Sequence, residues 1–434
     1  MTYRVCNTAE SDIGMRYYLT DVDGIGGRLK AEPEDFVVRE ISDRPEPCDD
    51  GKYVIVDVTS RNWETNRLMR LLSRSLRISR ECVGIAGTKD KRAITTQLMS
   101  FKCSIGDLDN VDFKDVSFKD PYRARRGISI GDLFGNEFEI RVTESESSKE
   151  ETQGVLDVVT SEICRIGGFP NYFGVQRFGT IRPVTHKVGE AIVRGDIEGA
   201  VMTYLSAFSD FEDDATKEAR VSMLNPSNWP DVISSIPDSL AFEKMMMDHL
   251  IANPDDWAGA ITKLPGNLQM MFTHAYQSYL FNMMLSERMS RGLPLNMPVA
   301  GDEVIPLDSS GIPLHESPVE VTERNIDLVS RQVKMRKAYV AFPLYGSESR
   351  VAKGEIGEIQ SKVLESEGIA NKDFIVPGIP KCNSKGNMRE LICPVSNLGH
   401  EVEEGGCRLS FSLPKGNYAT CLLREVMKSE MNRY

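Results

Sequence analysis

One aspartate lies among three cations in a short segment that begins with glycine. The segment reads Gly87-Thr88-Lys89-Asp90-Lys91-Arg92, and the alternating residues 94–101 that follow it predict a strand. A carboxylate with positive neighbours could act as a nucleophile or an acid/base group on a substrate that the cations attract. The segment alone leaves an ordinary alternative open, in which Asp90 only forms a surface ion pair.

Two predicted strands, residues 83–86 and 94–101, hold this loop at both ends, so we expect a sheet to fix Asp90 in place. A helix is predicted just upstream, over residues 64–76. Four arginines follow one face of this predicted helix, namely Arg67, Arg70, Arg74 and Arg77. Such a stripe could guide a phosphate backbone, or it could be a solvated helix face.

The charge distribution favours a local site for a polyanion on an acidic chain. The 434 residues carry a net charge of −12, yet residues 61–92 include nine cations and three carboxylates, a local net charge of +6. Phosphates respond to the local potential, so a basic face on an acidic body can still bind nucleic acid.

The composition, with 41% hydrophobic and 27% charged residues, predicts a globular protein of two or three domains. It has no run of eighteen apolar residues and no signal-peptide pattern, so we expect a cytoplasmic protein without membrane contact. Nine scattered cysteines without a CxxC pair and five histidines predict neither a zinc site nor a disulfide framework. No Walker or dinucleotide motif occurs, and without a heptad pattern we expect a monomer with no obligate protein partner.

The remaining chain predicts a strand-rich first part, a helix-rich middle and a final return to strand and helix. Further strands are predicted at 36–41, paired with 52–59, and at 137–143 and 408–413. Further helices are predicted at 152–166, 185–206, 240–252, 268–290 and 418–427, and surface loops at 208–218 and 226–237. The glycine pair 167–168 ends the first part.

Six motifs, in this order along the chain, resemble the TruD family of tRNA pseudouridine synthases. They are Lys30 with residues 33–36, then residues 87–97, 135–138, 171–179, 274–282 and 413–425. The chain length and the long middle segment resemble the archaeal and eukaryotic members. The resemblance implies an α+β fold: a pseudouridine synthase catalytic domain with a mixed, mainly antiparallel sheet and flanking helices, plus an inserted helix-rich TRUD domain. The implied catalytic domain is discontinuous, 1–168 with 389–434, and the implied insertion is 169–388.

The resemblance also implies an activity. Members of the family isomerise uridine in tRNA to pseudouridine without cofactor or metal, and uridine 13 of the D-arm is the implied target. The family's aspartate nucleophile corresponds to Asp90, and its basic partner corresponds to Lys30. The tRNA is then the expected partner, and the basic segment 61–92 is expected to help bind it.

The implied nucleoside pocket consists of Phe36, Asn136, Phe138 and Tyr418. A uracil turned out of its stack needs an aromatic face, for which Phe138 is the candidate, and an amide partner, for which Asn136 is the candidate. Tyr418 stands where bacterial members can carry Phe, which adds a hydroxyl. Lys89 and Arg177 join the four arginines as candidates for RNA-backbone contacts.

Other interpretations remain open from the residues alone. Phe138 shares a predicted strand face with Ile140 and Val142, so it could be an ordinary core residue. A non-catalytic RNA-binding protein or tRNA chaperone could use the same motifs. An aspartyl-phosphate hydrolase would need further carboxylates to hold magnesium, whereas this loop offers only cations around Asp90.

Overall fold

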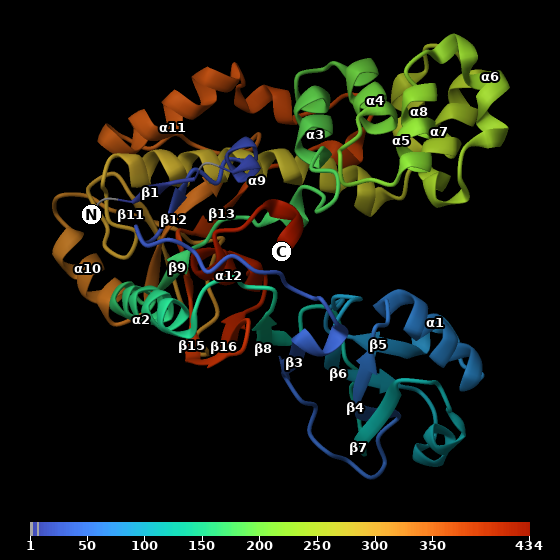
Figure 1. Ribbon diagram of the computed structural model, residues 1–434, viewed down its shortest axis with the longest axis horizontal. Coiled ribbons are helices and arrows are strands. Elements are labelled where there is room, and N and C mark those ends of the chain that lie inside the picture. The colour runs from blue at the N-terminus through green and yellow to red at the C-terminus, as the bar shows by residue number, and fades with distance from the viewer. Residues whose placement is uncertain (1–2, 7) are drawn as a thin grey trace. The chain divides into compact units, whose positions relative to one another are not determined.

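The computed structural model describes residues 3–6 and 8–434, which form two compact units (Figure 1). The sheet unit comprises Val22–Phe169, Cys393–Ser429 and Arg433–Tyr434. The helical unit comprises the described residues of Met1–Asp21, Pro170–Ile392 and Glu430–Asn432. The chain passes between the units within β9 (Gly168–Pro170) and β14 (Ile392–Pro394), and the described residues before Val22 group with the middle segment.

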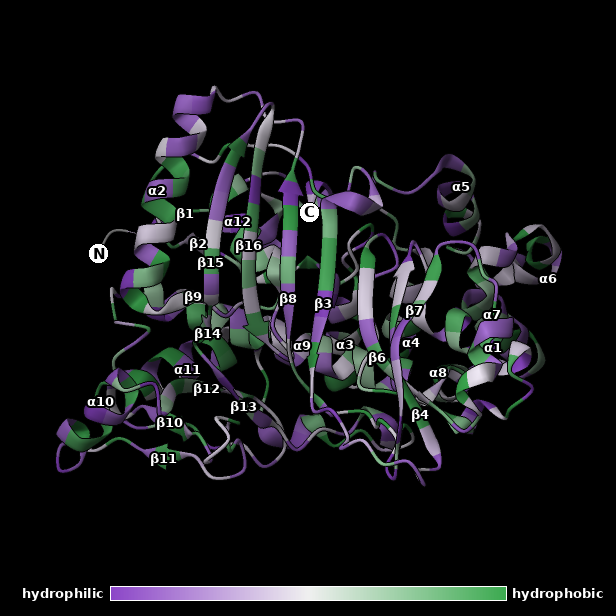
Figure 2. Cartoon of the chain, turned by 90° about the horizontal axis from the view of Figure 1, so that it is seen from below, coloured by the Kyte–Doolittle hydropathy of each residue, from purple (hydrophilic) through white to green (hydrophobic). Residues whose placement is uncertain are grey.

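An eight-stranded sheet forms the centre of the sheet unit, and seven of its strands follow the order β15-β16-β8-β3-β6-β4-β7 (Figure 2). The eighth strand, β5, pairs with β6. The strands are β3 (Phe36–Ser42), β4 (Tyr53–Arg61), β5 (Val83–Ile85), β6 (Ile94–Phe101), β7 (Val116–Ala124), β8 (Leu133–Val142), β15 (Ser396–Glu403) and β16 (Gly406–Pro414). Only β3 and β6 pair in parallel. The predicted α+β fold with a mixed, mainly antiparallel sheet is confirmed.

The pairing of β6 explains where the Asp90 loop (residues 86–93) lies. Because β4 pairs with β6 along its whole length, β3 and β5 share the other edge of β6. β3 pairs with residues 94–96 and β5 with residues 99–101, so the two strands lie end to end. The Asp90 loop therefore begins where β3 ends, in the middle of the sheet.

Three helices belong to the sheet unit: α1 (Thr65–Ser75), α2 (Lys149–Ile166) and α12 (Ala419–Met427). On α1, Leu68, Met69 and Leu72 are buried in one core with apolar residues of β4, β5 and β6. Each such side chain stabilises the fold by roughly 1.5–3 kcal/mol on burial. The carboxylate of Glu64 begins this helix by accepting hydrogen bonds from the first-turn amides, and α2 ends as predicted at Gly167 in a left-handed conformation.

The predicted pairing of 52–59 with 36–41 is wrong. The strand β4 instead lies between β6 and β7. Val54, Ile55 and Val56 are fully buried in succession, so both faces of β4 are covered, as is typical of a strand in the interior of a sheet.

The longest helix of the helical unit is α9, which spans Gly266–Ser290, is mostly buried and packs against α3, α8 and α11. The other helices are α3 (Thr185–Val193), α4 (Ile197–Ser206), α5 (Asp214–Ser222), α6 (Trp229–Val232), α7 (Ala241–Ala252), α8 (Trp257–Thr262), α10 (Ile326–Lys334) and α11 (Gly354–Glu367). The strands are β1 (Arg4–Val5), β2 (Tyr17–Tyr18), β10 (Glu303–Pro306), β11 (Val319–Glu320), β12 (Ala338–Leu344) and β13 (Asn387–Glu390). No helix within the described residues is long and apolar enough to cross a membrane.

Several predictions for this unit are corrected. The predicted helix 185–206 is two helices, because Gly195 adopts a positive φ of 80° and Asp196 then caps α4. The predicted surface loop 208–218 includes the first part of α5, and the predicted loop 226–237 contains α6. Trp229 is buried, and its Nε1 donates to the Met223 carbonyl (2.9 Å). The helices α10 and α11 were not predicted.

The family motifs at 171–179 and 274–282 build the core of the helical unit. Asn282 on α9 accepts a hydrogen bond from the Phe173 amide (2.8 Å) and donates one to the Phe173 carbonyl (3.0 Å). Phe173 and Phe281 pack edge to face, with centroids 5.7 Å apart. Phe173, Tyr276 and Phe281 are therefore core residues of this unit.

Candidate active site

Asp90 and Lys30 form an ion pair at the middle of the sheet unit. The Nζ of Lys30 lies 3.2 Å from Oδ2 of Asp90, and the side chains are 16% and 50% exposed, respectively. Lys30 adopts a positive φ of 56°, a conformation that costs energy for a residue with a Cβ and persists only where the surroundings hold it. The carboxylate is thus stabilised by an ammonium on one side and open to solvent on the other.

Aromatic rings lie directly beside this pair. The Nζ of Lys30 is 4.2 Å from the ring centroid of Phe36, which itself is buried. Phe36 meets Phe138 edge to face at 6.2 Å, and Phe138 stacks on Phe411 at 5.4 Å. Three predicted site residues, from a turn, β3 and β8, are therefore brought together with Asp90, and Phe138 is only partly buried.

Asn136 lies two residues before Phe138, on the same face of β8. A close approach of β8 and β16 fixes its position, because a Cβ at Gly135 would meet the Leu413 carbonyl oxygen at 2.3 Å. Oδ1 of Asn136 is buried and accepts no hydrogen bond from any residue the structure describes. A buried amide oxygen without a partner is rare and marks a place where a ligand can donate a hydrogen bond.

The prediction that Lys89 contacts RNA does not fit its position. Its side chain is 6% exposed and forms an ion pair with Glu40 of β3, whose side chain is 1% exposed. Glu40 also accepts a hydrogen bond from the Ser42 hydroxyl (2.5 Å) and pairs across the sheet with Asn136. Sequence reasoning missed Glu40, although alternation puts this carboxylate on the buried face that Phe36 and Val38 occupy.

Further contacts tie the Asp90 loop to its neighbours. The amide of Lys89 donates to Oγ1 of Thr65 (2.9 Å), at the start of α1. The guanidinium of Arg92 donates to the Ala31 carbonyl (2.8 Å), next to Lys30. With the Lys89–Glu40 pair, these bonds tie the Asp90 loop to β3, to α1 and to the segment next to Lys30.

The other predicted residues lie in less enclosed surroundings. Arg67, Arg70 and Arg74 are exposed on α1, but Arg77 lies beyond the helix, which ends at Ser75, and adopts a positive φ of 53°. Tyr418 directly precedes α12 and is half-buried.

Arg177 belongs to the helical unit, where its Nε donates to the Ser278 hydroxyl (3.0 Å) and its guanidinium lies 5.6 Å from the Phe173 ring. These contacts give Arg177 a structural role within that unit.

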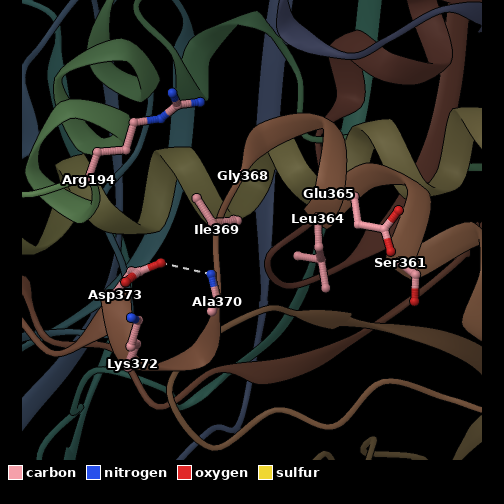
Figure 3. A pocket seen from close by; sticks show the side chains of 9 residues that line it. All are labelled: Arg194, Ser361, Leu364, Glu365, Gly368, Ile369, Ala370, Lys372 and Asp373. Atoms are coloured by element: carbon pink, nitrogen blue, oxygen red, sulfur yellow. Dashed lines mark hydrogen bonds between the residues drawn. The ribbon is translucent and has the colours of Figure 1, made fainter.

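A cavity of about 680 Å³ lies in the helical unit, and Figure 3 shows its lining. Two of its polar groups have partners in the local fold: Asp373 accepts from the Ala370 amide (2.8 Å), and Arg194 pairs with Glu190 (2.9 Å). None of the predicted site residues lines it. No group of three or more His, Cys, Asp or Glu side chains placed to hold a metal ion occurs within residues 3–6 and 8–434.

The fold and the site define an α+β protein in which a loop beside the central sheet holds a lysine-paired carboxylate near aromatic and amide side chains. The family model described as tRNA pseudouridine synthase D (TruD) matches residues 12–426. The chain belongs to this family of isomerases.

Similar archaeal proteins named "Probable tRNA pseudouridine synthase D" span nearly the whole chain. The relative from Methanosarcina mazei is 42% identical over 426 residues, 96% of this chain and 97% of its own. The relative from Methanococcoides burtonii is 43% identical over 428 residues, 97% of each chain. A crystal structure of a Methanosarcina mazei protein assigned to tRNA pseudouridine synthase D (TruD) matches with a TM-score of 0.86 and 40% identity, covering 98% of both chains.

Proposed function

We propose that this protein isomerises one uridine of tRNA, uridine 13 of the D-arm, to pseudouridine with Asp90 as the nucleophile. The observation that carries this proposal is the Lys30–Asp90 pair (3.2 Å) beside the Phe36–Phe138 aromatic pair. The sheet unit is then the catalytic domain and the helical unit the inserted TRUD domain. We further propose that the protein acts as a cytoplasmic monomer, with tRNA as its partner and without a cofactor or metal.

The reaction breaks the N1–C1′ bond of the nucleoside and forms a C5–C1′ bond. N1 gains a proton, and the hydrogen on C5 is released to solvent, so atoms and charge balance without an oxidant or co-reactant. In this scheme the Asp90 carboxylate bonds to the nucleoside while Lys30 stabilises its charge before attack and after release. Phe138 offers the detached uracil a stacking face, and Oδ1 of Asn136 accepts a hydrogen bond from it.

The assay is tritium release from tRNA that carries C5-tritiated uridine. The purified protein should release tritium, and the release should persist in EDTA. Mapping pseudouridines in tRNA from cells with and without the protein then identifies the target position. A protein that binds tRNA but releases no tritium would instead be the RNA-binding protein or chaperone, and loss of activity in EDTA would favour metal-dependent chemistry.

Replacing Asn136 with alanine should separate recognition from stability. Because its Oδ1 has no partner in the described part of the chain, we expect the free energy of unfolding to change by less than about 1 kcal/mol. The value of kcat/KM for tritium release should fall about 10- to 100-fold, the effect of one lost hydrogen bond to substrate. Urea unfolding and the release assay measure the two quantities. A large loss of stability with unchanged kcat/KM would assign Asn136 a purely structural role.

A further inference from the structure

Two neighbouring cavities form a groove beside the Asp90 loop, within the sheet unit. The first, about 480 Å³, is lined by Glu32, Pro33, Arg61, Asn62, Lys91 and Arg92. The second, about 290 Å³, shares Arg61, Asn62 and Lys91 with the first. It continues past Trp63, Glu64, Arg67, Lys114 and Asp115. We call the two together the cationic groove. Each has a volume near the lower end of those of small-molecule sites.

Some cations of the groove are held by hydrogen bonds within the described part of the chain, and others are not. Arg61 is held by Glu34 through two hydrogen bonds (2.6 and 3.3 Å), and this guanidinium holds the pKa of the Glu34 carboxyl below its usual value. Arg92 is held by the Ala31 carbonyl. These two arginines shape the wall of the groove. Because Arg61 and Arg92 already have partners, the other cations of the groove are the ones available to a ligand.

Three cations of the groove have no carboxylate partner among the residues that the structure describes: Arg67, Lys91 and Lys114. All three are exposed. Three carboxylates also line the groove, Glu32, Glu64 and Asp115, so its five cations outnumber its acids by two. Glu64 is already used, because it accepts hydrogen bonds from the amides of Asn66 (2.9 Å) and Arg67 (2.7 Å). Unpaired cations along a groove are the arrangement that binds the backbone of a single nucleic-acid strand.

Trp63 supplies a fixed aromatic ring in the same groove. Its Nε1 donates to the Lys114 carbonyl (3.2 Å), and its ring packs against Phe113 with centroids 6.2 Å apart. The Arg67 guanidinium lies 5.8 Å from the Trp63 ring. An indole ring that is fixed in place beside cations can stack with an unstacked base or pack against a ribose. Every nucleotide has both groups, so such a contact does not depend on sequence.

We propose that the cationic groove binds the RNA strand next to the target uridine, with Arg67, Lys91 and Lys114 on phosphates and Trp63 against a sugar or base. Lys91 directly follows Asp90, so the bound phosphates belong to nucleotides adjoining the one that reacts. This assignment rests on the proposed function in one respect: the nucleotide that lies at Asp90, beside the groove, is taken to be the reacting uridine.

The test measures tRNA binding in an Asp90→Ala background, which keeps the complex from turning over. The triple variant Arg67→Ala/Lys91→Ala/Lys114→Ala should bind tRNA at least about 10-fold more weakly at 150 mM salt. The slope of log K against log salt should become shallower by about 2, as expected for three lost phosphate contacts on a single strand. Trp63→Leu should weaken binding without changing that slope. The control is Lys149→Ala. Lys149 is an exposed lysine of α2, and the helix α2 packs against β15, the strand at the edge of the sheet opposite β7.

The outcomes separate the groove from the proposed reaction. If the triple variant binds tRNA with unchanged affinity and salt slope, the groove proposal is overturned, whatever the wild-type protein catalyses. If the triple variant binds weakly but the wild type releases no tritium, the groove stands as an RNA site and the proposed function fails. In the active background the same substitutions should raise KM and leave kcat within about threefold. A fall in kcat at unchanged tRNA affinity would also overturn the proposal.

Discussion

Replacing Asp90 with alanine is expected to slow tritium release from C5-tritiated tRNA by at least about 10⁴-fold, because in the proposed mechanism the Asp90 carboxylate supplies the bond to the nucleoside. The fold should persist. The Lys30–Asp90 pair is half exposed on the Asp90 side, and such pairs contribute roughly 0–1 kcal/mol. The variant should also keep its affinity for tRNA, because the cations of the groove remain.

Two further variants sharpen this prediction. Asp90→Asn keeps the size of the side chain and loses its charge, so it should be as inactive as Asp90→Ala. Asp50→Ala is the matched control, since Asp50 is an exposed aspartate in an ion pair with Arg125 (3.3 Å), and it should keep wild-type activity. Turnover by a folded Asp90→Ala protein would contradict the mechanism. Inactivity of both Asp90→Ala and Asp50→Ala would indicate general damage instead.

The largest expected change in stability comes from Lys89, the residue before Asp90. Lys89→Met should lower the free energy of unfolding by about 3–5 kcal/mol, since it leaves the Glu40 carboxylate buried without its counter-ion. The hydrogen bond from Ser42 remains but cannot neutralise that charge. Urea unfolding followed by circular dichroism measures the effect.

A double variant distinguishes this ion pair from simple packing. Lys89→Met/Glu40→Met removes both charges, so its free energy of unfolding should return to within about 1–2 kcal/mol of the wild-type value. Lys119→Met is the control, because Lys119 pairs with Asp120 on the surface at 3.7 Å, and it should change stability by less than about 0.5 kcal/mol. Losses that simply add in the double variant would rule out a coupled pair.

Local patterns predicted the elements around the site well. The alternation of 94–101 matches β6, and the apolar spacing of 64–76 matches α1 to within a residue at each end. The loop between two strands was also predicted, because glycine and charged residues interrupt two apolar runs there. Helices in the middle of the chain were harder. The segment containing α5 and α6 is polar along much of its length, so the burial of Ala219, Met223 and Trp229 in one core was not evident from the local pattern.

The sequence by itself determined the family, through six motifs in a fixed order, and with it the residues to examine: Asp90, Lys30, Phe36, Asn136 and Phe138. It also determined which side chains share a strand face, since alternation is a local property. Only the tertiary structure decided which strands meet. The parallel pairing of β3 with β6 brings Glu40 to Lys89, which turns a predicted RNA contact into a buried anchor beside Asp90. Pairing between strands that are distant in sequence depends on how the faces of the complete sheet are buried. No single segment of the chain contains that information.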